Sequence, residues 1–274
     1  MALVQKCKPR IITLEETFGI THNHHAHHFW LLIGQFTDLG YSVRWKIVKL
    51  CTWGSSQDRK RLIIIASAAG ERLPPFPQPT HSEHGGRGLK AYTTINKAIG
   101  AIRRSDRDWL HNLDTVKKFS PTLAPYNGDK LARTICTGAG EVPHPNGTRD
   151  FTLREYACLQ GFPISHRFFG TRTQVKRQIG NAFPPNTVEV LYKHIREWLA
   201  KEDGASPAQM DEDVIMIESD SDSEGSPIQD RYFARDLSPD MDDVIMIDDE
   251  EQAPLSDRRV GFAVRNGPLV IDLT

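Results

Sequence analysis

Gln57, Arg59 and Arg61 occupy alternate positions, and Arg61 is the first residue of an otherwise apolar run at residues 61–66. Residues two apart on a strand point the same way, so we expect Arg59 and Arg61 to face one side. The forked guanidinium of arginine can bind a phosphate group or the carbonyl oxygen of a base through paired hydrogen bonds. An exposed basic turn that binds nothing would show the same residues, so the pattern needs support from the rest of the chain.

Carboxylates follow an earlier apolar run. Residues 9–14 read as a buried parallel strand, and Glu15, Glu16 and Thr17 come directly after it. In open α/β sheets ligands bind at the carboxyl ends of the strands. Glu15 is therefore a candidate partner for the two arginines.

The elements that must position these groups can also be read from the pattern. Apolar residues at helical spacing predict a helix from about Phe29 to Leu39. Residues 41–50 alternate apolar and polar side chains, which predicts a half-buried strand. A short turn joins this strand to the run at 61–66, so we expect the two to be antiparallel neighbours. A strand, a helix and an antiparallel pair form the second half of an open α/β sheet.

Two motifs follow later in the chain. Thr152 and Glu155 have the spacing of a capping box, which predicts a helix that ends at Gly161. Residues 180 and 181, Gly-Asn, suit a tight turn, and two prolines at 184–185 begin a helix that runs to about Leu199. Residues 133–137 are expected to form a short strand.

These motifs resemble those of a known family. Residues 149–163 read Arg-x-x-Thr-x-Arg-Glu-x-Ala-x-Leu-Gln-Gly-Phe-Pro and residues 180–185 read Gly-Asn-Ala-x-Pro-Pro, which resemble the last two motifs of the DNA cytosine-5 methyltransferases, in a fungal-like form. The Gln-x-Arg-x-Arg pattern at 57–61 resembles another motif of that family. Residues 9–15 resemble the motif written Glu-Asn-Val, although Glu16 and Thr17 replace its Asn and Val.

The resemblance implies a role for each candidate residue. Glu15 would hold the N3 side of a cytosine flipped out of the duplex, and Arg61 would contact the base oxygen. Arg59 would meet a phosphate, and Gln57 and Arg149 would also contact DNA. Asn181 would lie in the motif that closes the pocket for S-adenosylmethionine, the methyl donor.

The resemblance also implies an architecture. We expect an α/β fold that is the C-terminal half of a Rossmann-like, S-adenosylmethionine-dependent methyltransferase domain. Its second half would occupy residues 1–72, an irregular target-recognition region 73–148, and closing helices 149–200. A disordered acidic tail would occupy residues 201–274.

Two parts of the family pattern are missing from the sequence. The family's nucleophilic cysteine follows a proline, but Cys7, Cys51, Cys136 and Cys158 do not. No glycine-rich cofactor loop precedes the first predicted strand. We therefore expect a fragment, or half of a split enzyme, that is inactive alone. The alternative is a non-catalytic protein that binds DNA and SUMO.

Charge is divided sharply along the chain. Residues 201–274 carry 20 acidic and 6 basic residues, a net −14, which leaves 28 basic and 15 acidic residues and a net +13 in residues 1–200. A basic body is typical of a DNA-binding domain, and DNA as substrate predicts a nuclear location. Three apolar blocks in the acidic tail, 214–217, 244–247 and 269–274, resemble SUMO-interaction motifs. A tail that only keeps the protein soluble is the alternative.

Other classes of function have weaker support. Five histidines lie within residues 22–28, but no carboxylate or cysteine accompanies them, so no metal site is predicted. No apolar run is long enough to cross a bilayer, so we predict no membrane partner.

Overall fold

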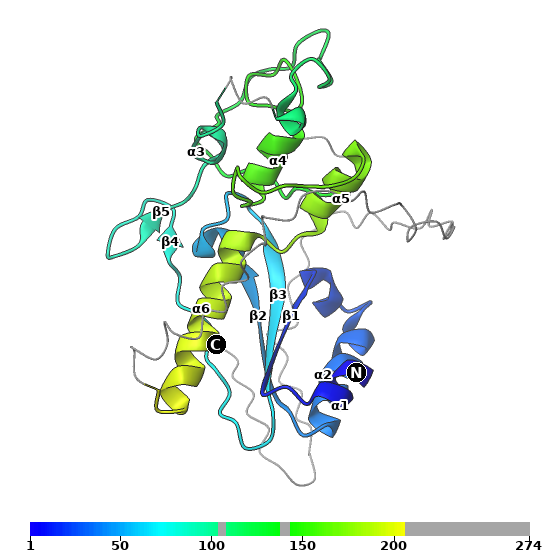
Figure 1. Cartoon of the computed structure of the whole chain (residues 1–274), viewed down its shortest axis with the longest axis vertical. Helices are drawn as coiled ribbons and strands as arrows, with labels where there is room; N and C mark the ends of the chain where they lie inside the picture. Colours follow the sequence, from blue (N-terminus) through cyan, green and yellow to red (C-terminus); the bar gives the residue numbers. More distant parts are fainter. Residues whose placement is uncertain (104–107, 138–142, 206–274) are drawn as a thin grey trace, which may run out of the picture.

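The structure, a computed structural model, describes residues 1–103, 108–137 and 143–205. A three-stranded sheet lies at its centre, with α2 (Ala26–Asp38) and the short α1 (Ala2–Cys7) on one side and α6 (Pro185–Glu202) on the other (Figure 1). Helices α3 (Ile95–Ile99), α4 (Leu153–Leu159) and α5 (Arg172–Asn181) gather beyond one end of the sheet. The described residues therefore form an α/β fold, as the sequence predicts.

The sheet has the order β1-β3-β2, formed by β1 (Ile11–Glu16), β3 (Lys60–Ser67) and β2 (Ser42–Lys49). Strand β3 is antiparallel to both neighbours, so the antiparallel pairing predicted for β2 and β3 is confirmed. The prediction of a buried parallel strand at residues 9–14 is wrong for the described residues. Strand β1 runs in the same direction as β2, but β3 separates them, and β1 is a half-buried edge strand.

Strand β3 is buried on both faces. Leu62, Ile64 and Ala66 pack with α2, whereas Ile63 and Ile65 pack with α6. Successive strand residues point to opposite faces. A strand that packs against an apolar helix on each face must therefore be apolar at every residue of this run. The apolar run that ends at Ala66 is explained by this position between two layers.

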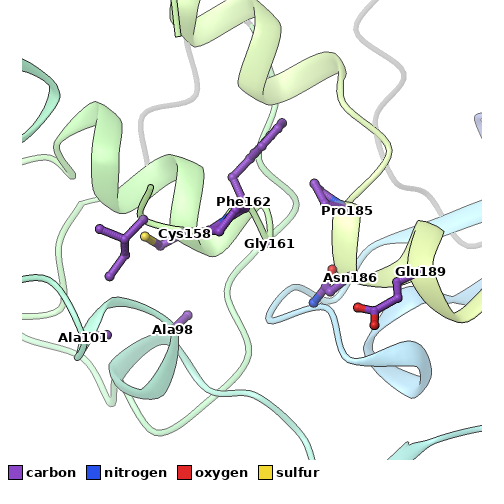
Figure 2. A pocket seen from close by; sticks show the side chains of 10 residues that line it. Ala98, Ala101, Cys158, Gly161, Phe162, Pro185, Asn186 and Glu189 are labelled. Atoms are coloured by element: carbon purple, nitrogen blue, oxygen red, sulfur yellow. The ribbon is translucent and has the colours of Figure 1, made fainter. Parts of the chain in front are cut away.

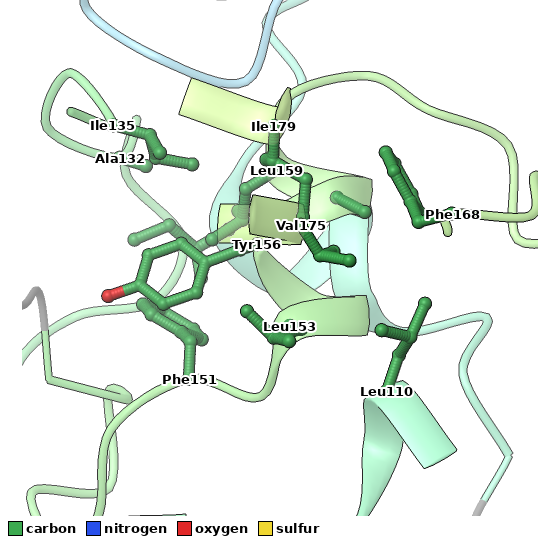
Figure 3. Packing of buried hydrophobic residues seen from close by; sticks show 12 residues of the cluster. Leu110, Ala132, Ile135, Phe151, Leu153, Tyr156, Leu159, Phe168, Val175 and Ile179 are labelled. Atoms are coloured by element: carbon green, nitrogen blue, oxygen red, sulfur yellow. The ribbon is translucent and has the colours of Figure 1, made fainter. Parts of the chain in front are cut away.

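A separate core lies beyond the sheet. Figure 3 shows it between α4 and α5, where Tyr156 and Leu159 of α4 face Val175 and Ile179 of α5. Loop residues complete it, including Leu110 from η3 (Trp109–His111). The two-residue strands β4 (His81–Ser82) and β5 (Lys90–Ala91) lie on the connection between the two cores.

The capping box predicted for α4 is confirmed. The Thr152 hydroxyl accepts a hydrogen bond from the Glu155 N–H, and the Glu155 carboxylate accepts one from the Thr152 N–H. Helix α6 begins at Pro185, as expected. Two local predictions are wrong. Gly180 and Asn181 form the last turn of α5 rather than a tight turn, and a second capping box at Thr171 and Gln174 begins that helix.

The second wrong prediction concerns residues 133–137, where the structure has no strand. Side chains from the 57–59 loop, rather than a neighbouring strand, bind the backbone here. The remaining short elements are the 3-10 turns η1 (Phe18–Thr21) and η2 (Leu50–Trp53), at the ends of β1 and β2.

The three tail blocks that resemble SUMO-interaction motifs, 214–217, 244–247 and 269–274, lie outside the described residues. So does most of the tail expected to be disordered. Within the described part of the chain, no helix combines the length and apolar character that crossing a bilayer needs.

Candidate functional site

A cavity of about 260 Å³ opens at the end of the sheet where β1 finishes and β3 begins. We call it the site cavity. Its walls come from four separate parts of the sequence: Glu15, Glu16 and Thr17; Arg59 and Arg61; Ile135, Cys136 and Thr137; and Gly180 and Asn181. Four of the six residues to which the sequence assigned a site role, Glu15, Arg59, Arg61 and Asn181, are thus brought together.

Sheet register places Glu15 beside Arg61. Glu15 lies opposite Ile63, so Arg61, two residues earlier on β3, is its diagonal neighbour on the same face. That face is the one covered by α6, because Ile63 packs there. The Glu15 Oε1 atom lies 2.6 Å from Arg61 Nε. A carboxylate and a guanidinium therefore form a close ion pair at the cavity wall.

The remaining atoms of this pair determine what it can bind. Arg61 Nη1 donates to the carbonyl of Lys60 at 2.7 Å. Among the described residues no hydrogen bond engages Arg61 Nη2 or Glu15 Oε2. Burial lowers the pKa of Arg61, and the adjacent Glu15 carboxylate opposes that shift. The pair can thus offer one donor and one acceptor, side by side, to a planar ligand.

Arg59 is held more deeply. It is 3% exposed, and it donates from Nη1 to the Ile135 carbonyl at 3.0 Å and from Nη2 to the Gly180 carbonyl at 3.4 Å. Burial lowers its pKa to about 10, and the nearby charge of Arg61 adds to this effect. Arg59 therefore remains protonated near neutral pH and binds two cavity walls to β3.

Gln57 does not reach the cavity. Its side chain has no exposed surface, and it donates to the Leu159 carbonyl and to Gln160 Oε1 while accepting from the Ile135 N–H. A fully buried side chain cannot contact DNA in this arrangement, so the DNA contact predicted for Gln57 is replaced by a structural one. Gln160 in turn donates to the Ala182 carbonyl, which links α4 to the end of α5.

Arg149 is also engaged elsewhere. Its Nη1 and Nη2 donate to the two Glu155 carboxylate oxygens at 2.7 and 2.8 Å. Burial by itself would raise the pKa of Glu155, but the hydrogen bonds from Arg149 and the Thr152 N–H outweigh it and hold that pKa below its usual range. Arg149 braces the start of α4, and its contact with DNA stays a prediction.

Asn181 is exposed at the cavity rim, where the sequence placed a cofactor contact. The described residues do not by themselves fit S-adenosylmethionine. The cavity that Asn181 lines holds two guanidiniums and two carboxylates, so its lining has no net negative charge that would attract a positively charged sulfonium.

Cys136 and Thr137 were missed as site residues. Segment 135–137 enters the cavity without regular secondary structure, so no periodic pattern marks it. Close packing fixes its place, because a Cβ on Gly180 would lie 2.9 Å from Thr137 Cγ2 and 3.1 Å from the Cys136 carbonyl carbon. The glycine of the 180–185 motif was the available signal, since it permits this contact.

A second cavity, of about 430 Å³, lies between α3, the end of α4 and the start of α6 (Figure 2). Cys158 and Phe162 line one side of it, and Asn186 and Glu189 line another. Burial raises the pKa of Cys158 to about 11, so its thiol is protonated at neutral pH. None of the site residues predicted from the sequence lines this cavity.

Comparison with known proteins assigns the chain to a family. The sequence model of the C-5 cytosine-specific DNA methylases matches residues 1–122 and 81–197. The chain therefore belongs to the C-5 cytosine-specific DNA methylase family, whose members use S-adenosylmethionine as methyl donor.

Relatives come from bacteria and plants. The type II methyltransferase M.NgoFVII of Neisseria gonorrhoeae is 30% identical over 234 residues, which cover 71% of this chain and 60% of that protein. The DNA (cytosine-5)-methyltransferase 4 of Arabidopsis thaliana is 26% identical over 294 residues, which cover 70% of this chain and 19% of that protein. The chain thus spans at most about 60% of the length of these two relatives.

A solved structure confirms the fold. A protein described as a DNA modification methyltransferase encoded within a prophage (E.coli) superposes with a TM-score of 0.57 at 18% identity, covering 72% of each chain. The expected α/β methyltransferase architecture is confirmed by this similarity.

Gly180→Ala should destabilise the packing that forms the wall of the site cavity. The new methyl group would meet backbone atoms of residues 136 and 137, which cannot rotate away, so we expect a loss of about 1–3 kcal/mol in unfolding free energy. Gly34→Ala is the matched control, since a Cβ there has nothing within 4 Å and should stabilise α2 by about 0.5–1 kcal/mol. Urea unfolding measures both changes, and equal effects would contradict the close packing at Gly180.

Arg149→Met should destabilise the fold in a pH-dependent manner. Removing one partner of a buried ion pair costs about 3 kcal/mol, because Glu155 is left without its charge partner. The lowered pKa of Glu155 contributes stability above its unfolded pKa, and this is lost as pH falls through the folded pKa. Urea unfolding should therefore show a large gap between variant and parent at pH 7 that narrows below pH 4. A gap that is constant with pH would contradict this role.

Proposed function

We propose that this chain is the base-binding part of a DNA (cytosine-5) methyltransferase. The observation that carries the proposal is the Glu15–Arg61 pair, 2.6 Å apart, in a cavity shared with Arg59 and Asn181 in a chain of this family. The positive charge of residues 1–200 supports DNA as the partner. A nuclear location follows as part of the same proposal.

The groups left free on the ion pair suit the edge of a cytosine. Arg61 Nη2 can donate to the base oxygen O2, while Glu15 Oε2 faces the N3 side and can share a proton with it. A proton held at N3 draws electron density from the ring and makes C6 more electrophilic. The duplex hides this edge by base pairing, so the base must be extruded before it can enter the cavity.

Arg59 has a different part in this proposal. Its two hydrogen bonds to carbonyls connect β3 with residues 135 and 180, so it fixes the width of the cavity. The phosphate contact expected for Arg59 is less well supported, because the side chain is 3% exposed. Positioning the cavity walls is the role that the geometry favours.

Arg61→Ala should weaken recognition of an extruded base. We expect it to reduce the preference for a duplex with a mismatched cytosine, which flips out readily, over a fully paired duplex by about 1–2 kcal/mol. Titration of both duplexes at two salt concentrations measures this. Arg72→Ala is the matched control, because Arg72 is an exposed arginine paired with Glu202, away from the cavity. If both variants lose the same preference, Arg61 contributes only its charge.

The chain alone should transfer no methyl group. No cysteine follows a proline in this sequence, and the described residues do not fit the methyl donor. We therefore expect no methylation of duplex DNA when the purified chain is incubated with labelled S-adenosylmethionine, while DNA binding persists in the same preparation. Robust incorporation of label would refute this part of the proposal.

A further inference from the structure

The four cysteines have very different surroundings. Cys51 and Cys158 are buried, and burial raises the pKa of each thiol, so both are poorly reactive. Cys7 is exposed on α1, outside both cavities. Cys136 is exposed and lines the site cavity. Among the four, Cys136 alone combines an accessible thiol with a built cavity.

Segment 135–137 holds this thiol in a fixed place. The Ile135 N–H donates to Gln57 Oε1 at 2.7 Å, and the Ile135 carbonyl accepts from Arg59 at 3.0 Å. Gly180 packs so closely that an added Cβ would lie 3.1 Å from the Cys136 carbonyl carbon. Three contacts on two consecutive residues hold the backbone at Cys136, and its Sγ–H donates to the Thr134 carbonyl at 3.7 Å.

The charge beside the thiol favours an anionic ligand. Arg59 also lines the cavity, bonds only to carbonyls, and its buried Nε has no hydrogen-bond partner among the described residues. Glu15 is paired with Arg61, and the exposed Glu16 is the other carboxylate of the cavity. Arg59 is thus a buried cation next to Cys136 with no carboxylate of its own.

We propose that Cys136 is a reversible modification site for a small anionic disulfide, such as oxidised glutathione, and that the mixed disulfide closes the site cavity. The second half of this proposal rests on the proposed base-binding function. The Cys136 thiol loses its proton to solvent, and its sulfur attacks one sulfur of the disulfide. The old S–S bond breaks, and its electron pair leaves on the glutathione thiolate. A thiol reductant reverses the exchange.

Occlusion follows from where the new group must lie. A glutathionyl group on Cys136 adds a tripeptide to a cavity of about 260 Å³ that Glu15 and Arg61 also line. Its carboxylates can compete with Glu15 for Arg61. Both effects remove the donor and acceptor that a cytosine would use.

The site of modification is tested on the full chain with oxidised glutathione, followed by peptide mapping. We expect Cys136 to react roughly tenfold faster than Cys7, with little reaction at the buried thiols. Cystamine, a cationic disulfide, is the charge control and should lose most of this selectivity. Equal rates at Cys7 and Cys136 with oxidised glutathione, or a higher selectivity with cystamine, would overturn the assignment.

The effect on the cavity is tested by the preference for a mismatched cytosine over paired DNA. Modified protein should lose this preference and recover it with a thiol reductant. Cys136→Ser should show the same preference with and without the disulfide, whatever its starting value, whereas Cys7→Ser should lose the preference on treatment as the parent does. An unchanged preference at complete Cys136 modification would overturn the occlusion. If the untreated chain shows no preference, the proposed function fails, and the peptide map still decides the modification site.

Discussion

Burial of β3 on both faces is the constraint on which the rest of the structure depends. Because α2 covers one face and α6 the other, Leu62, Ile64 and Ala66 pack in one layer and Ile63 and Ile65 in the other, while antiparallel pairing with β1 and β2 aligns the strand. This fixed register places Arg61 on the face of α6, diagonal to Glu15. The ion pair at the cavity is therefore a consequence of core packing two to four residues away.

The second core adds the walls that the sheet lacks. Helices α4 and α5 each begin with a capping box, and each buries its apolar side against the other. At the end of α4, Gln160 accepts a hydrogen bond from Gln57. At the end of α5, Gly180 packs against segment 135–137. The site cavity lies where these two cores meet, which is why its residues are so far apart in the sequence.

Regular spacing made part of this arrangement predictable. The alternation at 57–61 and the position of Glu15 after an apolar run were enough to place three cavity residues. This is because side chains two residues apart on a strand point to the same face. The pairing of β1 was not predictable, because an apolar run does not specify its neighbour. Cys136 was missed because its segment is held by side chains distant in sequence, and Gln57 was misassigned because polarity alone does not reveal burial.

The buried amide of Gln57 has a consequence for sequence variation. It both donates, to Leu159 and Gln160, and accepts, from Ile135, so neither a carboxylate nor an aliphatic side chain of similar size can replace it alone. Positions 57 and 160 should therefore covary among related chains. A related chain that replaces the amide at position 57 would need a compensating replacement at position 160.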